Sequence, residues 1–162
     1  MPLTPDELLA RLDSLGIAHS TVSHPPVFTV EEAKRLRGTL PGSHVKNLFL
    51  RDKKKAMWLL TALEDAQIDL RSLEAKLGSS RLSFGSADRL MEFLGVIPGA
   101  VTPFAAVNDA GGQVTVVLQR TLLDIAPINC HPLTNDRTTA LAPGDLVAFL
   151  RSTGHDPRLI DL

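Results

Sequence analysis

The chain has 162 residues, 44% of them hydrophobic and 22% charged, which is the composition of an ordinary globular protein. Its net charge of −1 argues against a strongly nucleic-acid-binding protein as a whole. No apolar run approaches the roughly 18 residues of a membrane span, and the N-terminus lacks the pattern of a signal peptide, so we expect a cytoplasmic protein with no membrane partner.

The first half of the chain carries clear helix signals. Thr4 and Glu7 form a capping box for a helix that ends at Gly16, and residues 17–22 are expected to be a strand. Thr29 and Glu32 offer a second capping box, which predicts a helix over 30–37. Further expected elements are a hairpin of strands 44–51 and 56–62, a helix ending at residue 77, and a helix over 87–94.

The second half is richer in expected strands. Residues 105–108 and 114–118 flank the strong turn signal 109–112, and short strands are expected at 128–130 and 138–141. The last helix is expected over 143–152. Because helices and strands are interleaved and no long linker appears, we predict one α/β domain over residues 1–162, with a mixed sheet flanked by helices.

Basic residues are concentrated in one segment. Residues 34–55 hold eight Lys or Arg and one acid, whereas the rest of the chain holds nine basic and 17 acidic residues. This segregation predicts a positive face that attracts phosphates, although a solvated helix end and a lysine-rich turn explain it equally well.

Three segments are candidates for chemistry, and the first is the strand 44–51. Both of its faces carry large apolar groups, so we expect it to be covered on both sides. Lys46 and Asn47 then lie among buried neighbours, where a lysine is rarely found without an interaction partner or a function. The alternative is that the ammonium group of Lys46 reaches the sheet edge.

The second candidate is the segment 95–104. Gly95, Pro98, Gly99 and a second proline predict a rigid, irregular loop whose main-chain N–H groups can hold a carbonyl or a developing oxyanion. A plain connection between a helix and a strand is the alternative.

The third candidate is the polar segment 128–139, which contains adjacent Cys130 and His131. Neighbouring strand residues point to opposite faces, so the pair does not form a nucleophile with its base, and we retain His131 alone as a pocket residue. Cys130 is the single cysteine of the chain, so no internal disulfide forms. The five histidines are scattered, and we predict no metal site and no cofactor.

Other classes of protein have little support. The chain lacks the motifs of phosphate-binding loops, dinucleotide-binding folds, serine hydrolases and zinc proteases. Aromatic residues make up only 4%, and tyrosine is absent, which disfavours a protein that stacks many bases of a single strand.

Taken together and in this order, these segments resemble the YbaK/prolyl-tRNA editing-domain family. The resemblance is carried by Val45-Lys46-Asn47-Leu48, by the loop from Gly95 through Thr102 to Phe104, and by His131-Pro132-Leu133-Thr134-Asn135. It spans nearly the whole chain and implies a partly barrel-like mixed sheet. Within the family, the sequence is most similar to the freestanding deacylases that clear Ala-tRNA(Pro).

The resemblance also implies a set of roles. Lys46 would place the ester, with Asn47 beside it, and the Gly95, Pro98 and Gly99 loop would shape the pocket and polarise the carbonyl. His131 and Thr102 would contact the substrate. The expected contacts to the tRNA acceptor stem and 3′ end come from four basic residues, Lys34, Arg37, Lys53 and Arg81. The attacking water would be activated by the ribose hydroxyl of the substrate.

Several alternatives stay open. The substrate is Cys-tRNA(Pro) or Ser-tRNA in one reading, and a small ester or amide in another. A further reading is a tRNA-binding or synthetase-binding module without hydrolysis. Prolyl-tRNA synthetase is a potential partner in each of the tRNA readings.

Overall fold

The computed structural model describes residues 2–26, 28–37 and 40–162, without the side chains of residues 33, 36 and 37. Among these residues the helices are α1 (Pro5–Ser14), α2 (Val30–Arg37), α3 (Leu70–Leu77), α4 (Ala87–Leu94) and α5 (Pro143–Ser152), with short 3₁₀ helices η1 (Pro98–Ala100), η2 (Pro103–Asn108) and η3 (Arg120–Asp124). The strands are β1 (His19–Ser23), β2 (Ser43–Asp52), β3 (Met57–Leu63), β4 (Leu82–Phe84), β5 (Val114–Gln119), β6 (Ile128–Cys130), β7 (Arg137–Leu141) and β8 (Arg158–Ile160).

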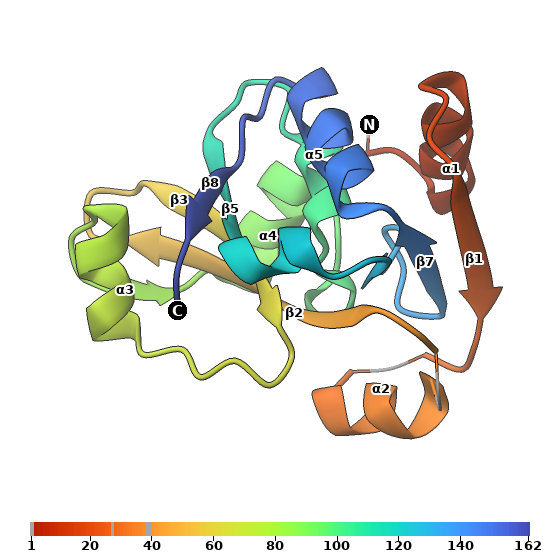
Figure 1. Cartoon of the computed structure of the whole chain (residues 1–162). Coiled ribbons are helices and arrows are strands. Elements are labelled where there is room, and N and C mark those ends of the chain that lie inside the picture. The colour runs from red at the N-terminus through yellow and green to blue at the C-terminus, as the bar shows by residue number, and fades with distance from the viewer. Residues whose placement is uncertain (1, 27, 38–39) are drawn as a thin grey trace.

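The strands form one mixed sheet in the order β1-β7-β6-β2-β3-β5-β8, with β4 also paired to β2 (Figure 1). The pairs β2–β6, β3–β5 and β5–β8 are parallel, and the other pairs are antiparallel. The predicted mixed sheet with flanking helices is therefore confirmed. The expected barrel-like closure is not present, because β1 and β8 lie at opposite ends of the order and the described sheet does not close.

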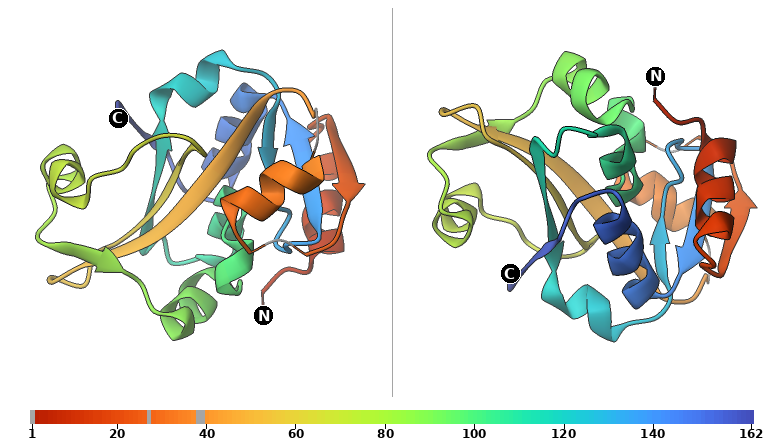
Figure 2. Two further views of the ribbon diagram at one scale, coloured as in Figure 1. Left: turned by 90° about the horizontal axis from the view of Figure 1, so that it is seen from below. Right: turned by 90° about the horizontal axis from the view of Figure 1, so that it is seen from above.

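The central hairpin is buried on both faces, as its apolar pattern predicts. Phe49 and Leu59 pack with α4, whereas Leu50, Trp58 and Leu60 pack with α3 on the opposite face. Successive side chains of a strand point to opposite faces, so this division follows from the sequence alternation. Figure 2 shows α3 and α4 on either side of the hairpin formed by β2 and β3.

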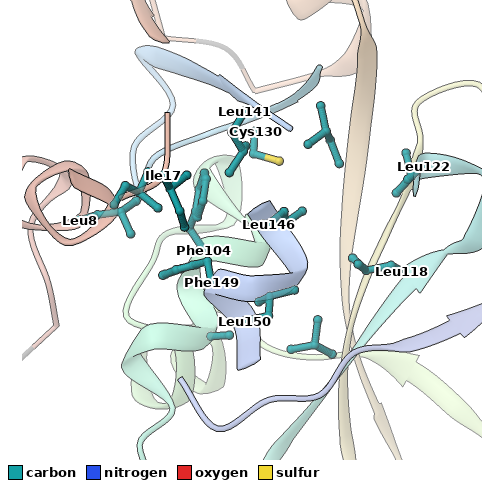
Figure 3. Close-up of a cluster of buried hydrophobic side chains, with 14 residues drawn as sticks. Leu8, Ile17, Phe104, Leu118, Leu122, Cys130, Leu141, Leu146, Phe149 and Leu150 are labelled. Atoms are coloured by element: carbon teal, nitrogen blue, oxygen red, sulfur yellow. The ribbon is translucent and has the colours of Figure 1, made fainter. Parts of the chain in front are cut away.

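A third core lies between the sheet and helices α1 and α5 (Figure 3). Its centre is an edge-on contact between Phe104 and Phe149, whose ring centroids are 5.4 Å apart. Leu8 of α1 and Leu150 of α5 close it from two sides, and both are fully buried. The α1 capping box predicted at Thr4 and Glu7 is present.

Two expectations about the elements were wrong, and two short strands were not expected. Residues 105–108 are not a strand but belong to η2, because Thr102 caps this helix and Pro103 begins it. The first strand covers 19–23 rather than 17–22. The three-residue strands β4 and β8 had no prediction, since both depend on pairing with distant strands.

Candidate active site

A pocket of about 150 Å³ lies where the first half of β2 meets α2 and the loop after α4. Its lining includes five of the predicted site residues, which come from three separate parts of the chain: Lys46, Asn47, Pro98, Gly99 and His131. Figure 2 shows α2 beside this half of β2. The fold therefore brings the three candidate segments of the sequence to one place.

The main chain of β2 faces the pocket along an open edge. The His44 carbonyl accepts a hydrogen bond at the β3 side, whereas the Phe49 carbonyl accepts one from the residue after β4. Even-numbered residues thus pair with β3, and odd-numbered residues face the other edge. On that edge the described partners are β6 at residues 43–44 and β4 at 50–52. In a parallel ladder the pairing of His44 with Asn129 uses the N–H of Val45, so it is the main chain of Asn47 that lies in the gap between these strands.

Lys46 and Asn47 are both held by neighbours. The ammonium group of Lys46 donates a hydrogen bond to the carbonyl oxygen of Ala66, in the segment after β3. The side-chain oxygen of Asn47 accepts a hydrogen bond of 2.6 Å from the hydroxyl of Thr61, its cross-strand partner. This bond leaves the amide hydrogens of Asn47 as donors. Both residues line the pocket, although their side chains leave opposite faces of β2.

The loop after α4 contributes Pro98 and Gly99 to the pocket, but not Gly95. Gly95 ends α4 with a φ of +67°, and its N–H bonds to carbonyls of the last turn, so its role is to cap the helix. Gly99 lies so close to its neighbours that a Cβ atom on it would be 2.8 Å from Cδ1 of Phe28 and 3.1 Å from Nδ2 of Asn135. Thr102 is fully buried and caps η2, away from the pocket lining.

His131 lies directly after β6, and its ring is oriented by a 2.9 Å hydrogen bond between Nδ1 and the carbonyl of Arg137. A carbonyl only accepts, so Nδ1 carries a hydrogen and Nε2 of the neutral ring is an acceptor. Burial lowers the pKa of His131, the Arg137 carbonyl opposes this, and His24, with its ring centroid 6.2 Å away, lowers the pKa further. The ring is therefore neutral at physiological pH.

The predicted basic face is divided into two groups. Lys34 lies on α2 beside the pocket and forms a 2.6 Å ion pair with Asp65, and the side chain of Arg37 lies outside the described residues. Lys53 and Arg81 are exposed at the opposite end of the hairpin. With a rise of about 3.3 Å per residue, β2 places Lys53 roughly 20 Å from Lys46.

The far basic group has a rigid support, the carboxylate of Asp52. It accepts hydrogen bonds from the main chain of Lys54 and Ala56 in the turn after β2, and from the main chain of Ser80 beside Arg81. Burial raises the pKa of Asp52, but these hydrogen bonds together lower it more. The ionised carboxylate therefore joins the two basic loops into one surface.

Cys130 takes no part in the pocket. It is buried in the core between β6 and α5, and burial raises the pKa of its thiol to about 12. A thiol that stays protonated is a poor nucleophile. This agrees with the sequence argument that set Cys130 aside.

Four pocket residues lie outside the candidate segments and had no predicted role in the site: Phe28, Thr29, Val30 and Glu64. Thr29 and Val30 were expected only as the start of a helix, and Phe28 and Glu64 had no prediction of any kind. Phe28 precedes the Thr29 cap of α2, and Glu64 follows β3 directly. No local pattern marks either residue, because their position depends on how α2 and β3 pack around β2. Composition marks Phe28 only weakly, as one of the few aromatic residues in this chain.

Comparison with known proteins places the chain in a family. Residues 24–149 match the family model of the aminoacyl-tRNA editing domain. The chain belongs to the aminoacyl-tRNA editing domain family. The match includes the β2 strand, the loop after α4 and His131, which are the segments that carried the resemblance. That resemblance is therefore confirmed.

Relatives of this editing domain match over most of its length. It is 38% identical to the prolyl-tRNA editing protein ProX of Acetoanaerobium sticklandii, over 96% of this chain and 95% of that protein. It is 43% identical to the prolyl-tRNA synthetase associated domain-containing protein 1 of Xenopus laevis, over 95% and 94% of the two chains. It is 30% identical to the multifunctional Ser/Thr-tRNA deacylase ProXp-y of Escherichia coli, over 64% of each.

A solved structure supports the fold. The crystal structure of a candidate trans-editing enzyme for prolyl tRNA synthetase superposes with a TM-score of 0.75 and covers 99% of this chain and 98% of that one, at 22% identity. At this identity the likeness concerns the fold alone. The names of the sequence relatives support a hydrolase activity on aminoacyl-tRNA in general.

Within residues 2–26, 28–37 and 40–162, no group of three or more His, Cys, Asp or Glu side chains is arranged to hold a metal ion. No helix in the described part of the chain is long and apolar enough to cross a membrane.

Proposed function

We propose that this protein is a trans-editing deacylase that hydrolyses mischarged Ala-tRNA(Pro) to alanine and tRNA(Pro). The observation that carries the proposal is the pocket of about 150 Å³ in which Lys46, Asn47, Pro98, Gly99 and His131 meet. The pocket offers one cation, neutral donors and main-chain groups. These are the groups that bind and polarise an ester, and an aminoacyl ester is already reactive toward water.

The proposed reaction is attack of water on the ester carbonyl, followed by loss of the ribose oxygen of the terminal nucleotide. Lys46 binds the 3′ end and places the ester. The N–H groups of Gly99 and of the open edge of β2 stabilise the negative charge that develops on the carbonyl oxygen. The neighbouring ribose hydroxyl accepts the proton of the attacking water and passes its own proton to the departing ribose oxygen. This route needs no nucleophilic side chain, and Cys130 has no part in it.

The size of the pocket fits a small acyl group. A cavity of about 150 Å³ holds a molecule the size of benzene. Alanine, serine and cysteine are all smaller than that, so selection among them depends on the groups that line the pocket. The ring of proline is no larger than benzene, so in this proposal the rejection of proline depends on the lining groups as well. The site then acts behind a synthetase that cannot reject alanine strongly.

The two basic groups give tRNA a place to bind. In the proposal Lys34 lies near the 3′ end, and the surface of Lys53 and Arg81 contacts phosphates of the acceptor stem. Such contacts weaken as salt is added, because each releases bound counterions. A relative is named for association with prolyl-tRNA synthetase, which supports this synthetase as a partner.

The test is a deacylation assay with tRNA(Pro) charged with alanine, cysteine, serine or proline. We expect alanine to be released fastest and proline to be spared. Faster release of cysteine or serine would contradict the assignment of alanine but keep the deacylase. Binding of charged tRNA without release above background would show a binding module, and equal activity on a free alanyl ester would show a small-molecule hydrolase.

A further inference from the structure

Phe28 is a large apolar side chain that lines the pocket and remains 65% exposed. A buried phenylalanine contributes about 1.5–3 kcal/mol relative to an exposed one, and Phe28 gains little of this within the chain. The residue therefore lies at the rim of the pocket, with apolar surface available to whatever enters.

The other aromatic side chains have different places. Trp58, Phe49, Phe104 and Phe149 are buried in the three cores, and Phe93 is partly buried against one of them. Phe84 is exposed to a similar extent, 63%, but lies on β4 and does not line the pocket. Among the described residues Phe28 is the one phenylalanine or tryptophan that lines the pocket, and the imidazole of His131 is the other ring there.

The ring of Phe28 is held in place from one side. Its Cδ1–Cε1 edge faces Gly99, where a Cβ atom would be 2.8 Å and 3.1 Å from these two atoms. The main-chain N–H of Phe28 donates a 3.3 Å hydrogen bond to the carboxylate of Glu32 on α2. One edge of the ring is thus packed while most of the residue faces solvent.

We propose that Phe28 stacks on the base of the 3′-terminal nucleotide when the aminoacyl group occupies the pocket. This inference rests on the proposed function, since it takes an aminoacyl-tRNA as the ligand. The ester joins the amino acid to the ribose of that nucleotide, so the base lies one sugar away from the acyl group. With the acyl group beside Lys46 and Gly99, the base reaches the rim where Phe28 lies.

Stacking on one base is consistent with the composition of the chain. A protein that binds a long single strand needs several aromatic groups, whereas one terminal base needs one. A stacked base is worth about 1–3 kcal/mol and is insensitive to base identity, because every base has a π face. Phe28 in this role orients the terminal ribose and with it the ester that Lys46 places.

The test compares Phe28→Ala, Phe28→Leu and Phe28→Trp in deacylation of an alanylated acceptor-stem minihelix, with or without its 3′-terminal base. Stacking predicts that Phe28→Ala raises KM roughly tenfold on the normal substrate. Phe28→Trp retains the native KM, and Phe28→Leu, which is apolar but has no π face, behaves like the alanine variant. On the abasic substrate the native protein and Phe28→Ala have the same KM, because loss of the base and loss of the ring remove the same stacking interaction.

Phe84→Ala is the matched control, and it should leave KM unchanged on both substrates. A loss in Phe28→Ala that persists in full on the abasic substrate overturns the proposal, and so does a changed preference between alanine and proline, which would make Phe28 a wall of the acyl pocket. If the native protein releases no amino acid, the proposed function fails. Binding of the uncharged minihelix with and without its terminal base then decides the stacking inference separately.

Discussion

The ammonium group of Lys46 donates a hydrogen bond to the main-chain carbonyl of Ala66, which lies three residues beyond the end of β3. A lysine within a sheet that is covered on both faces is thereby held with its charge at the wall of the pocket. The bond also means that Lys46 is oriented before substrate arrives, which lowers the entropic cost of placing the ester.

Lys46→Ala is expected to reduce deacylation of Ala-tRNA(Pro) by about 100-fold, because the ester loses the group that places it. Lys76→Ala is a matched control, since Lys76 also donates to one main-chain carbonyl, that of Asp161, but on α3 away from the pocket. Single-turnover rates and thermal unfolding of both variants give the comparison. Equal activity of the two variants, with folding intact, would refute the role of Lys46.

Gly99→Ala is expected to lower activity roughly tenfold, by misplacing the groups around the ester. Its new Cβ would lie 2.8 Å from the ring of Phe28 and 3.1 Å from the amide of Asn135, so the pocket wall has to shift. Gly144→Ala in α5 is the control, because a Cβ there meets nothing within 4 Å. Activity in Gly99→Ala equal to that of the control would show that the wall yields without affecting the reaction.

The double variant Lys53→Ala/Arg81→Ala is expected to raise KM and leave kcat unchanged, since both residues lie far from the pocket. If each contacts one phosphate of the stem, the slope of log K against log salt becomes shallower by about 2. Arg151→Ala, which removes an exposed arginine paired with Asp156, should not change the slope. Measurements of tRNA affinity at several salt concentrations test this, and an unchanged slope in the double variant would place the stem elsewhere.

The lowered pKa of His131 predicts how stability depends on pH. Between the lowered folded pKa and about 6.5, the unfolded chain binds a proton that the folded chain does not, so stability rises with pH in this window and levels off above it. His131→Gln should remove this contribution and flatten the rise. Urea unfolding at pH 5 and pH 7.5 measures it, and the same pH difference in both proteins would count against a perturbed histidine.

Cys130→Ala is expected to retain full deacylase activity and to lose about 1 kcal/mol of stability, as is usual for a small change in a packed core. Burial raises the pKa of the Cys130 thiol to about 12, so a thiol reagent at neutral pH should not label the native protein. Labelling at the rate of an unfolded control, or loss of turnover in the variant, would contradict the conclusion that Cys130 is not the nucleophile.

Much of the fold follows from local signals. Asp69 and Gly78 bound α3, and Ser86 and Gly95 bound α4, as capping rules predict. Short apolar runs are ambiguous between helix and strand. Residues 105–108 form part of a 3₁₀ helix because Thr102 caps this helix and Pro103 begins it. The short strands β4 and β8 depend on distant partners and leave no local pattern, whereas β6, of the same length, was expected at 128–130.

The site was predictable only in part for the same reason. Lys46, the glycine-proline loop and His131 stand out because their residue types are unusual in their settings, and the pocket unites them. Phe28 and Glu64 are ordinary residues that the packing of α2 and β3 brings to the pocket. The basic segment is continuous in sequence, yet a ten-residue strand separates its two ends in space.

The length of β2 turns this separation into a fixed distance. One end of the strand bounds the pocket, and the other end carries the turn that Asp52 locks to the loop before β4. A ligand that engages both ends must span roughly 20 Å, at about 3.3 Å for each strand residue between them. The strand therefore sets the minimum length of a ligand that contacts both surfaces. A short ester that fills the pocket makes no contact with the basic surface at the far end of β2.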